Sequence, residues 1–345
     1  MHSDPVQHEL RVMTKATTIQ DIARQAGVSK STVSRVLNKT TPVHPDKAEA
    51  VMAAARQLGF EPNQFARSLA SGRSMTVGIL TQNLGSPFYD AIAQGAIAEL
   101  EESGYSPIFA DGRWESKVEK QAIRSLLGRR VDGLLLIGGQ LTGGELKTLC
   151  GDLPRVTMAR HLPAKQHCCM YVDNVQGGFL ATQHLVRHGH KNIAFIGGLK
   201  HHPDAKDRLQ GYQQALKKSG IRFVPGLVLD GDFSATAGHK AVHALIKSRR
   251  EFTAILAAND TSAYGARLAL DQHGLRVPQD VSLVGYDDQA ESAFMIPPLT
   301  TVHQPAHLLG ETGAKAIVDA IQGQDVPSQV FLPELRCRES VATIA

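Results

Sequence analysis

Short apolar segments alternate with longer amphipathic ones over most of this chain, from residue 75 onward. The apolar segments are 76–81, 106–110, 131–137, 194–197, 254–257 and 281–286. Between the first of these, segments 87–103 and 117–129 have the apolar spacing of helices. Buried β-branched runs separated by such helices are typical of parallel sheets with right-handed crossovers. A region of this length is large for one open sheet, so we predict an α/β core of two lobes with a cleft between them.

The segment 18–38 has a different pattern, that of two short helices joined by a tight turn. Thr18 can cap the first helix, and Asp21 would lie at the positive end of that helix. Gly27 suits a turn that needs a positive φ angle, and Ser29 can cap the second helix. Such a pair is typical of helix-turn-helix DNA-binding proteins, although an ordinary helical hairpin on a protein surface gives the same pattern.

The second helix of this pair has one apolar and one polar face. Val33, Val36 and Leu37 recur at spacings of three and four and would face inward. Short hydroxyl and basic side chains on the outer face suit contacts with DNA phosphates and base edges. The candidate DNA-contacting residues of the helix pair are Thr18, Ser29, Lys30, Ser31, Thr32, Ser34, Arg35 and Asn38.

A third helix is expected over residues 45–58, with Val51, Met52 and Ala55 among its inward residues. The predicted organisation is a disordered tail over 1–14, a small three-helix DNA-binding bundle over 15–60, a short helix-capable segment with its linker over 61–74, and a core over 75–345. The short segment would span only about two helical turns, so we expect it to order only against a partner.

Net positive charge is confined to the N-terminal part of the chain. Residues 1–73 contain 10 Lys and Arg against 6 Asp and Glu, whereas the remainder contains 27 of each, from totals of 37 and 33. Chance can produce such an asymmetry over a short segment, but nucleic-acid binding predicts it.

Several other classes of protein have no support in the sequence. The four cysteines have no metal-ligand spacing and are expected to be reduced thiols, and no apolar run approaches the roughly 18 residues of a membrane span. We therefore expect a cytoplasmic protein without membrane contacts. There is no phosphate-binding glycine motif and no recognisable catalytic constellation, and His201 and His202 lack a metal-ligand arrangement. We predict that the chain is not an enzyme and has neither a cofactor nor a metal site.

Several motifs far from the helix pair resemble those of one protein family. They are Asp-Arg-Leu-Gln-Gly-Tyr at 207–212, Pro-Gln-Asp-Val-Ser-Leu-Val-Gly-Tyr-Asp-Asp at 278–288, Pro-Leu-Thr-Thr-Val at 298–302, Pro-Asn-Gln-Phe-Ala-Arg-Ser-Leu-Ala at 62–70 and Gly-His-Lys-Asn-Ile at 189–193. Together with the helix pair they closely resemble the lactose/galactose-repressor (LacI/GalR) family of bacterial transcription regulators. The resemblance covers residues 15–343.

This resemblance implies a headpiece, a hinge helix and a core like that of periplasmic sugar-binding proteins. One lobe would comprise residues 75–172 and 302–330, and the other 173–300 and 331–343. The family implies a homodimer whose headpieces bind the two halves of a near-palindromic operator in double-stranded DNA. Asn63 and Leu69 belong to the implied hinge, where Leu69 matches the leucine that wedges into the minor groove.

The candidate effector-binding residues are Phe88, Tyr89, Arg160, Arg208, Phe233, Asn259 and Asp287. Phe88 and Tyr89 follow the first strand, where a ligand ring can stack on them, although they could equally pack the next helix. By resemblance, Phe233 packs on the effector, Arg160 is similar to the galactose-type members, and Asn259 is similar to the sugar-responsive members.

Arg208 and Asp287 match the effector-binding arginine and aspartate of the family. An Arg and an Asp that face one cleft can hydrogen-bond sugar hydroxyls as donor and as acceptor. The alternative is a salt bridge that holds the lobes together. Purine-responsive members have Gly-Gly-Asp where this chain has Ala-Asn-Asp at 258–260, which favours a sugar over a purine.

The resulting hypothesis is a repressor of a sugar or glycoside utilisation operon, released from its operator by an effector bound between the lobes. Within the family a bound ligand can instead act as a co-repressor. A periplasmic-type sugar receptor and a nucleotide-dependent enzyme are the rival interpretations, and the helix pair argues against the first. Because the sequence stops soon after the core, we expect a dimer rather than a tetramer.

Overall fold

The computed structural model describes residues 17–38, 41–60, 73–163 and 168–344. The chain divides into two compact units, residues 1–74 and residues 75–345, which we refer to as the N-terminal unit and the core unit. The expected tail and almost all of the expected hinge segment lie outside the described residues.

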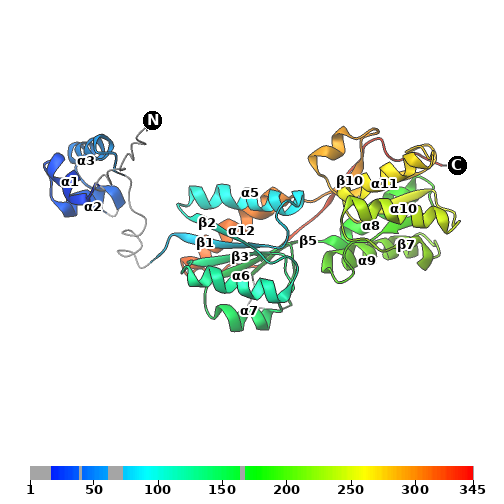
Figure 1. Cartoon of the computed structure of the whole chain (residues 1–345), viewed down its shortest axis with the longest axis horizontal. Coiled ribbons are helices and arrows are strands. Elements are labelled where there is room, and N and C mark those ends of the chain that lie inside the picture. The colour runs from blue at the N-terminus through cyan, green and yellow to red at the C-terminus, as the bar shows by residue number, and fades with distance from the viewer. Residues whose placement is uncertain (1–16, 39–40, 61–72, 164–167, 345) are drawn as a thin grey trace, which may run out of the picture. The chain divides into compact units, whose positions relative to one another are not determined.

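The described part of the N-terminal unit contains three helices: α1 (Ile19–Gln25), α2 (Lys30–Asn38) and α3 (Pro45–Gln57) (Figure 1). Thr18 caps α1, since its hydroxyl accepts a hydrogen bond from the Asp21 amide at 3.3 Å, while the Asp21 carboxylate accepts one from the Thr18 amide at 3.0 Å. Gly27 has a φ of +62°, which glycine adopts without strain. The Ser29 hydroxyl accepts a hydrogen bond from the Thr32 amide at 3.2 Å. The local features of the helix pair are therefore those that the sequence predicts.

Ile22, Val33 and Val51, one from each helix, are fully buried at the centre of this unit. The expectation that Met52 faces inward is wrong, because its side chain is 44% exposed and Ala54 is buried in its place. Successive helical residues lie about 100° apart around the axis, so the residue directly after Val51 leaves the buried face.

Six parallel strands form the sheet of the first half of the core unit, which we call lobe 1, in the order β11-β5-β4-β3-β1-β2. The strands are β1 (Thr76–Thr81), β2 (Ser106–Asp111), β3 (Gly133–Ile137), β4 (Arg155–Met158), β5 (Cys168–Val172) and β11 (Gln329–Phe331). Helices α5 (Pro87–Glu102) and α12 (Ala306–Ile321) cover one face, and α6 (Ser116–Gly128) and α7 (Gly143–Cys150) cover the other (Figure 1). All residues of β3 are buried, as expected for a strand covered on both faces.

The second half of the core unit, lobe 2, has the sheet order β12-β10-β9-β8-β6-β7. The strands are β6 (Ile193–Ile196), β7 (Val228–Leu229), β8 (Ala254–Ala257), β9 (Ser282–Asp287), β10 (Thr300–His303) and β12 (Glu334–Arg336). Five of them pair in parallel and β12 pairs with β10 in antiparallel sense, which the predicted parallel pattern did not include.

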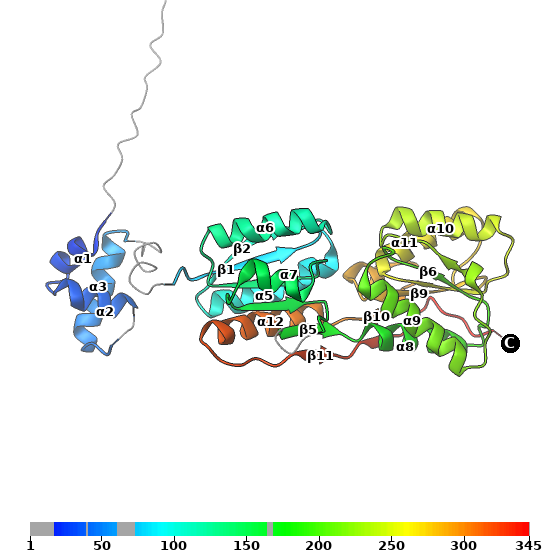
Figure 2. The ribbon, with the colours of Figure 1, turned by 90° about the horizontal axis from the view of Figure 1, so that it is seen from below.

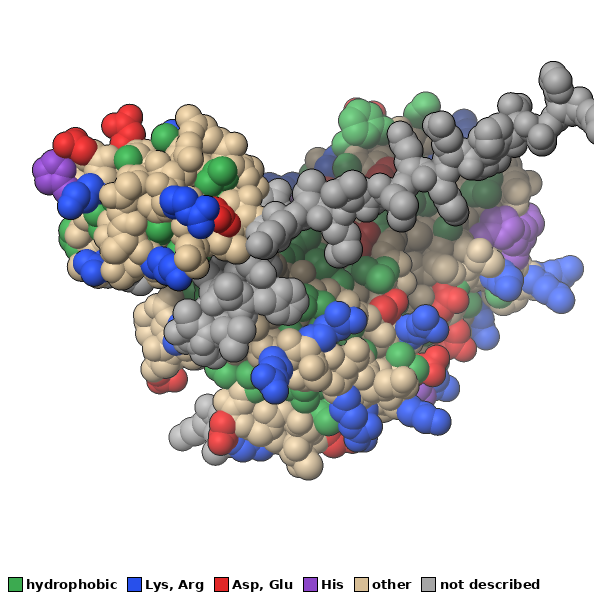
Figure 3. Space-filling view, turned by 60° about the vertical axis from the view of Figure 1, so that its left-hand side comes forward, with side chains coloured by type: hydrophobic (Ala, Val, Ile, Leu, Met, Phe, Trp, Pro, Cys, Tyr) green, Lys and Arg blue, Asp and Glu red, His purple; other side chains and the backbone are tan. Residues whose placement is uncertain are grey.

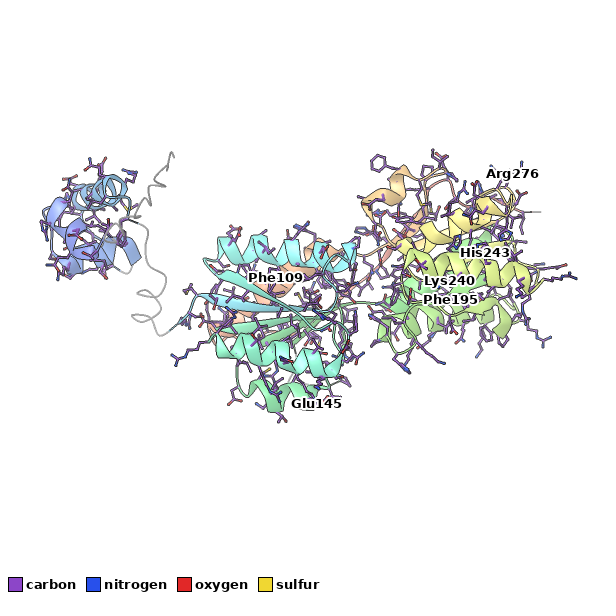
Figure 4. The ribbon with its side chains drawn as sticks, in the orientation of Figure 1. Phe109, Glu145, Phe195, Lys240, His243 and Arg276 are labelled. Atoms are coloured by element: carbon purple, nitrogen blue, oxygen red, sulfur yellow. The ribbon has the colours of Figure 1, made fainter. Side chains whose placement is uncertain are left out.

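Helices also cover both faces of the second sheet. They are α8 (Asn174–Arg187) with α9 (Pro203–Lys218) on one face, and α10 (Ala235–Lys247) with α11 (Asp260–Gln272) on the other (Figure 2). Short 3-10 helices span Pro225–Leu227 and Ala290–Phe294. Phe195 on β6, labelled in Figure 4, packs on Tyr212 of α9 with their ring centroids 5.4 Å apart. The two-lobed α/β fold is therefore the predicted one.

Three chain segments connect the lobes: β5 to α8, β10 to α12, and β11 to β12 (Figure 2). The predicted lobe boundaries at 302 and 330 need correction, since Val302 and His303 belong to the sheet of lobe 2 and Phe331 to that of lobe 1. Each crossover falls where a strand ends rather than within it, because the ladder hydrogen bonds keep a strand in one sheet. Among the described residues, no helix has the length and apolar character needed to cross a membrane.

Helices α5 and α12 approach each other closely at two glycines. A Cβ atom at Gly95 would run into the backbone carbonyl of His307, and one at Gly310 into that of Ile92. We expect Gly95→Leu to lower the free energy of unfolding by about 1–3 kcal/mol, because backbone atoms have little room to move aside. Urea unfolding followed by circular dichroism measures this.

The matched control is Gly144→Ala in α7, where an added Cβ would meet no atom within 4 Å. Alanine there is expected to leave stability unchanged or raise it by up to about 1 kcal/mol. Equal destabilisation by both substitutions would contradict the close approach of α5 and α12.

Candidate functional site

The polar face of α2 carries both hydroxyl and basic side chains. The hydroxyl of Ser29 lies 2.8 Å from the Ser31 hydroxyl and 2.9 Å from the Thr32 hydroxyl, so these three form a local network at the start of the helix. The side chains of Lys30, Ser31 and Arg35 are exposed, which leaves them accessible to an external ligand.

The other DNA-contact candidates form local hydrogen bonds, are half-buried, or lie outside the described residues. The Thr18 hydroxyl donates to the Asp21 carboxylate at 2.6 Å, so Thr18 acts first as a helix cap. Ser34 is half-buried. The side chain of Asn38, and the whole of Asn63 and Leu69, lie outside the described part of the chain. The visible face of the N-terminal unit carries acidic as well as Lys and Arg side chains (Figure 3).

A cavity of about 100 Å³ lies between the two lobes of the core unit. It is lined by Asn83, Ser86, Phe88, Tyr89, Trp114, Leu199, His202, Asp204, Arg208, Asp232, Phe233, Asn259 and Asp287. Six of the seven predicted effector-binding residues are among them. The lining follows the carboxyl ends of strands in both sheets, which is where ligands bind in open α/β folds.

Arg208, on α9, is held at the back of this cavity by several partners. Its Nε donates to Asn174 Oδ1 at 2.8 Å, one terminal nitrogen donates to the Ala258 carbonyl, and that nitrogen lies 3.6 Å from Asp287 Oδ1. Its Cζ atom also lies 3.8 Å from the centroid of the Tyr286 ring. The side chain is 4% exposed, so its charge depends on these contacts.

Asp287 ends β9 and faces the same cavity. Its carboxylate accepts a hydrogen bond from Gln304 Nε2 at 2.7 Å. Because α9 and β9 both belong to lobe 2, the alternative in which Arg208 and Asp287 hold the two lobes together is wrong. Asp287 and Asp288 have φ angles of +111° and +58°. Such strained backbone is retained where surrounding contacts fix it, commonly at functional sites.

Burial raises the pKa of two carboxyl groups in the cavity. It raises the pKa of Asp287 to about 6, with the nearby Arg208 charge acting in the opposite direction. Burial likewise raises the pKa of Asp204 to about 6 against the pull of Arg208 and Arg160. The cavity therefore holds two carboxyl groups that change charge close to neutral pH.

Aromatic rings from both lobes close the cavity. The Trp114 and His202 ring centroids are 4.3 Å apart, and Phe233 lies 5.1 Å from His202. His202 Nδ1 accepts a hydrogen bond from the Asp204 amide, so the neutral ring carries its proton on Nε2, 3.3 Å from the Tyr89 hydroxyl. Burial lowers the pKa of His202 to about 3, which keeps the ring neutral. Trp114 and Tyr89 belong to lobe 1 and His202 to lobe 2, so these contacts join the lobes.

Phe88 and Tyr89 fit both of their predicted roles. Each is 8% exposed and packs in the core of lobe 1, yet each also lines the cavity. Asn259 lines it too, but its amide is occupied: Oδ1 accepts from the Ser262 amide at 3.0 Å and Nδ2 donates to the Phe233 carbonyl at 3.0 Å. Asn259 therefore caps α11 and positions Phe233.

Arg160 does not line the cavity of Arg208, contrary to the prediction that groups it there. It lines a neighbouring compartment of about 580 Å³, which we call the outer compartment, with Trp114, Gly139, Gln140, Leu199, Lys200, His201, His202 and Pro203. Trp114, Leu199 and His202 line both spaces, so the two are adjacent.

Seven lining residues of the cavity are missing from the sequence-based prediction: Asn83, Ser86, Trp114, Leu199, His202, Asp204 and Asp232. Gln304, which donates a hydrogen bond to Asp287, is missing from it as well. Trp114 is the one tryptophan of the chain, and Asp204 lies one helical turn before Arg208. The rarity of Trp114 and the spacing of Asp204 from Arg208 favour a place for both residues in the site, but they do not show what either residue contacts. No periodic pattern marks His202 or Gln304, which lie in segments between regular elements.

No group of three or more His, Cys, Asp or Glu with metal-binding geometry occurs in the described ranges. The four cysteines are all free thiols.

Two family models match the chain. Residues 18–63 match the bacterial regulatory proteins of the lacI family, and residues 182–341 match a periplasmic binding protein-like domain. The HTH-type transcriptional repressor PurR of Haemophilus influenzae is 34% identical over 334 residues, which cover 95% of this chain and 99% of that protein. The HTH-type transcriptional regulator GalR of Escherichia coli is 34% identical over 329 residues, 94% of this chain and 96% of that one. The chain belongs to the LacI family.

Solved structures of LacI-family regulators share the fold. The Lac repressor dimer bound to operator and the anti-inducer ONPF has a TM-score of 0.85 and 32% identity, covering 95% of this chain and all of that one. The transcriptional regulator CelR in complex with cellobiose has a TM-score of 0.71 and 35% identity, covering 94% and 99%. This LacI-family member is therefore a DNA-binding transcriptional repressor with a ligand-binding core, and its relatives are transcriptional regulators rather than enzymes. Regulators of this family bind operator DNA and small-molecule effectors and are dimers.

The raised pKa of Asp287 predicts a pH dependence of stability. A folded-state pKa of about 6, above the usual 3.8, means that the folded protein binds a proton more readily than the unfolded chain. The proton on Asp287 therefore stabilises the folded protein fully below about pH 4, and this stabilisation is lost as the pH rises through 6. We therefore expect the Tm of Asp287→Asn minus that of the wild type to increase between pH 4 and 7.

Differential scanning fluorimetry over that pH range measures the difference. Asp230→Asn, at an exposed carboxylate, is the matched control and should give no comparable trend. A pH-independent difference for Asp287→Asn would contradict the buried, proton-binding carboxyl.

Proposed function

We propose that this chain represses an operon for the use of a sugar or glycoside, and that it leaves its operator when that sugar binds between the lobes. The observation that carries the proposal is the cavity in which Arg208 and Asp287 meet the rings of Phe88, Tyr89 and Phe233. Paired cationic and anionic groups match the donors and acceptors of sugar hydroxyls, and aromatic rings suit the apolar face of a sugar ring.

The cavity is smaller than the roughly 300–1,000 Å³ typical of ligand pockets, so we expect it to widen when a sugar enters, with Trp114 and His202 moving apart. Such a separation would break the contacts between the lobes and change their relative orientation. In a dimer, lobe 1 of each subunit continues into the segment that leads to the headpiece, so lobe rotation would move the two headpieces relative to each other. Effector and operator would then weaken each other's binding by the same factor.

A purine is the second candidate for the effector. The PurR relatives favour it, and the aromatic lining of the cavity would also suit a planar base. The Ala-Asn-Asp at 258–260, in place of the Gly-Gly-Asp of purine-responsive members, and the CelR–cellobiose neighbour favour a sugar. A ligand that strengthened operator binding instead of weakening it would make the effector a co-repressor.

We propose a homodimer, with an exposed apolar surface on lobe 2 as part of its interface. Phe294 is 84% exposed, Ile296 is 85% exposed, and Leu268 of α11 is 53% exposed. Arg267 Nε donates to the Ile296 carbonyl at 3.3 Å, which ties this loop to α11. Apolar side chains exposed together are costly in water and suit a second copy of the chain. As a regulator of bacterial operons, the dimer would act in the cytoplasm.

Lys30 is expected to contact base edges, so Lys30→Ala should weaken binding to the preferred DNA by about tenfold or more. Binding to random DNA should fall far less, because phosphate contacts dominate it. Fluorescence anisotropy with a duplex selected in vitro by the wild-type protein measures both affinities. The selected sequence should be near-palindromic.

Lys47→Ala is the control, since Lys47 is an exposed residue of α3. Equal losses for the two variants, or equal losses on selected and random DNA, would count against α2 as the recognition helix.

For the effector, we expect a sugar that raises the Tm of the full-length protein to release the selected duplex. Arg208→Lys keeps the charge but loses the bond from Nε to Asn174, and should raise the sugar concentration needed for half-release by about 10- to 100-fold. Anisotropy titration in the presence of the duplex gives this concentration.

Arg222→Lys, at an exposed arginine, is the matched control. Release by hypoxanthine or guanine, but by no sugar, would replace the sugar proposal by the purine one.

A further inference from the structure

The outer compartment differs in charge from the cavity that holds Arg208. Its charged lining residues, Arg160 and Lys200, are both cationic, and no Asp or Glu lines it. The inner cavity, by contrast, is lined by Asp204, Asp232 and Asp287 against the single Arg208. A ligand that occupies both spaces would therefore meet acceptors at one end and cations at the other.

Arg160 is the residue on which the outer compartment's charge depends. Within the described part of the chain, its guanidinium has no hydrogen-bond partner and no ion pair within 4 Å. Burial lowers its pKa, and the Glu119 charge, at longer range, acts in the opposite direction. The Glu119 carboxylate itself is 1% exposed and accepts a hydrogen bond from the Gln140 amide at 2.8 Å, so it is already occupied. Among the described residues, therefore, none occupies the N–H donors of Arg160, and a ligand can accept hydrogen bonds from them.

The surroundings add to this preference for negative charge. Helix α9 begins at Pro203, on the wall of the compartment, and the positive end of its dipole lies there. The volume of about 580 Å³ is within the range of small-molecule pockets. The partition between the two spaces is the Trp114–His202 ring pair, whose separation would join them.

We infer that the effector is an anionic sugar, with its hydroxyls in the inner cavity and a carboxylate or phosphate on Arg160 in the outer compartment. This inference rests on the proposed function, since it takes the cavity of Arg208 as the sugar site. Guanidinium groups bind both anions through paired, charge-assisted hydrogen bonds. Lys200, which is exposed, supplies a second positive charge at the rim.

The test compares sugars that differ only in the charged group. Calorimetric titration of the full-length protein uses glucose and galactose, their uronic acids, their 6-phosphates and two neutral disaccharides, lactose and cellobiose. At least one anionic sugar should bind about tenfold or more tightly than its neutral parent, and its affinity should fall as salt rises from about 50 to about 300 mM. Comparison of the uronic acids with the 6-phosphates shows whether the site prefers a carboxylate or a phosphate.

Arg160→Gln should remove this advantage, with a loss of about 10- to 100-fold for the anionic sugar and little change for its neutral parent. Lys247→Gln, at an exposed lysine of α10 outside both spaces, is the control for the lost charge and should bind like the wild type.

Four results would overturn the inference, and the last of them is distinguishable from the other three. If a neutral sugar binds and releases the operator while its anionic partner binds no better, the inference fails and the proposed function stands. The same conclusion follows if Arg160→Gln binds the anionic sugar as the wild type does, or if a neutral disaccharide binds most tightly. If the protein binds its operator but none of these sugars, both the inference and the sugar proposal fail.

Discussion

The burial of the Arg208 guanidinium is the constraint on which the ligand-binding core depends. A charge that is 4% exposed must be satisfied by its neighbours, and here these come from three parts of lobe 2: Asn174 at the start of α8, the Ala258 carbonyl after β8, and Asp287 at the end of β9. Loss of one partner from a buried charge pair typically costs about 3–5 kcal/mol. The same contacts that stabilise Arg208 therefore bring the carboxyl ends of these strands together as one binding surface.

The coupling between the lobes depends on different contacts, which are weaker and more easily broken. Trp114 and Tyr89 from lobe 1 meet His202 from lobe 2 through a ring contact and one hydrogen bond of 3.3 Å. Asp288, next to Asp287, accepts a hydrogen bond from Arg338 at 2.6 Å and contacts His303 at 3.0 Å, so it anchors the end of β10 beside the crossover to α12. In the proposed mechanism, a ligand that separated these rings would therefore act on the contacts between the lobes, while lobe 2 would keep its own buried network.

Much of the fold could be predicted because the signals are local. The expected strands 76–81 and 254–257 coincide with β1 and β8, since each is one apolar run bounded by polar or turn residues. The cap at Thr18 and the turn at Gly27 follow from the chemistry of single residues. The lobe boundaries were misplaced by one or two residues, because a strand's membership of a sheet depends on its partner strand. The inward position of Met52 was also wrong, for the helical geometry favours Ala54.

By itself, the sequence determined the helix pair and the alternation that makes a two-lobed α/β core. It also singled out Arg208, Asp287 and Phe233 of the cavity lining, but not Trp114 or Asp204. Helical spacing, strand length and capping are properties of neighbouring residues, so they can be predicted without coordinates. Only the tertiary structure decided that Arg208 and Asp287 belong to the same lobe, that His202 and Trp114 close the cavity, and that Arg160 lines a separate compartment. Those facts depend on contacts between residues far apart in the chain, such as Tyr89 with His202, which no local pattern specifies.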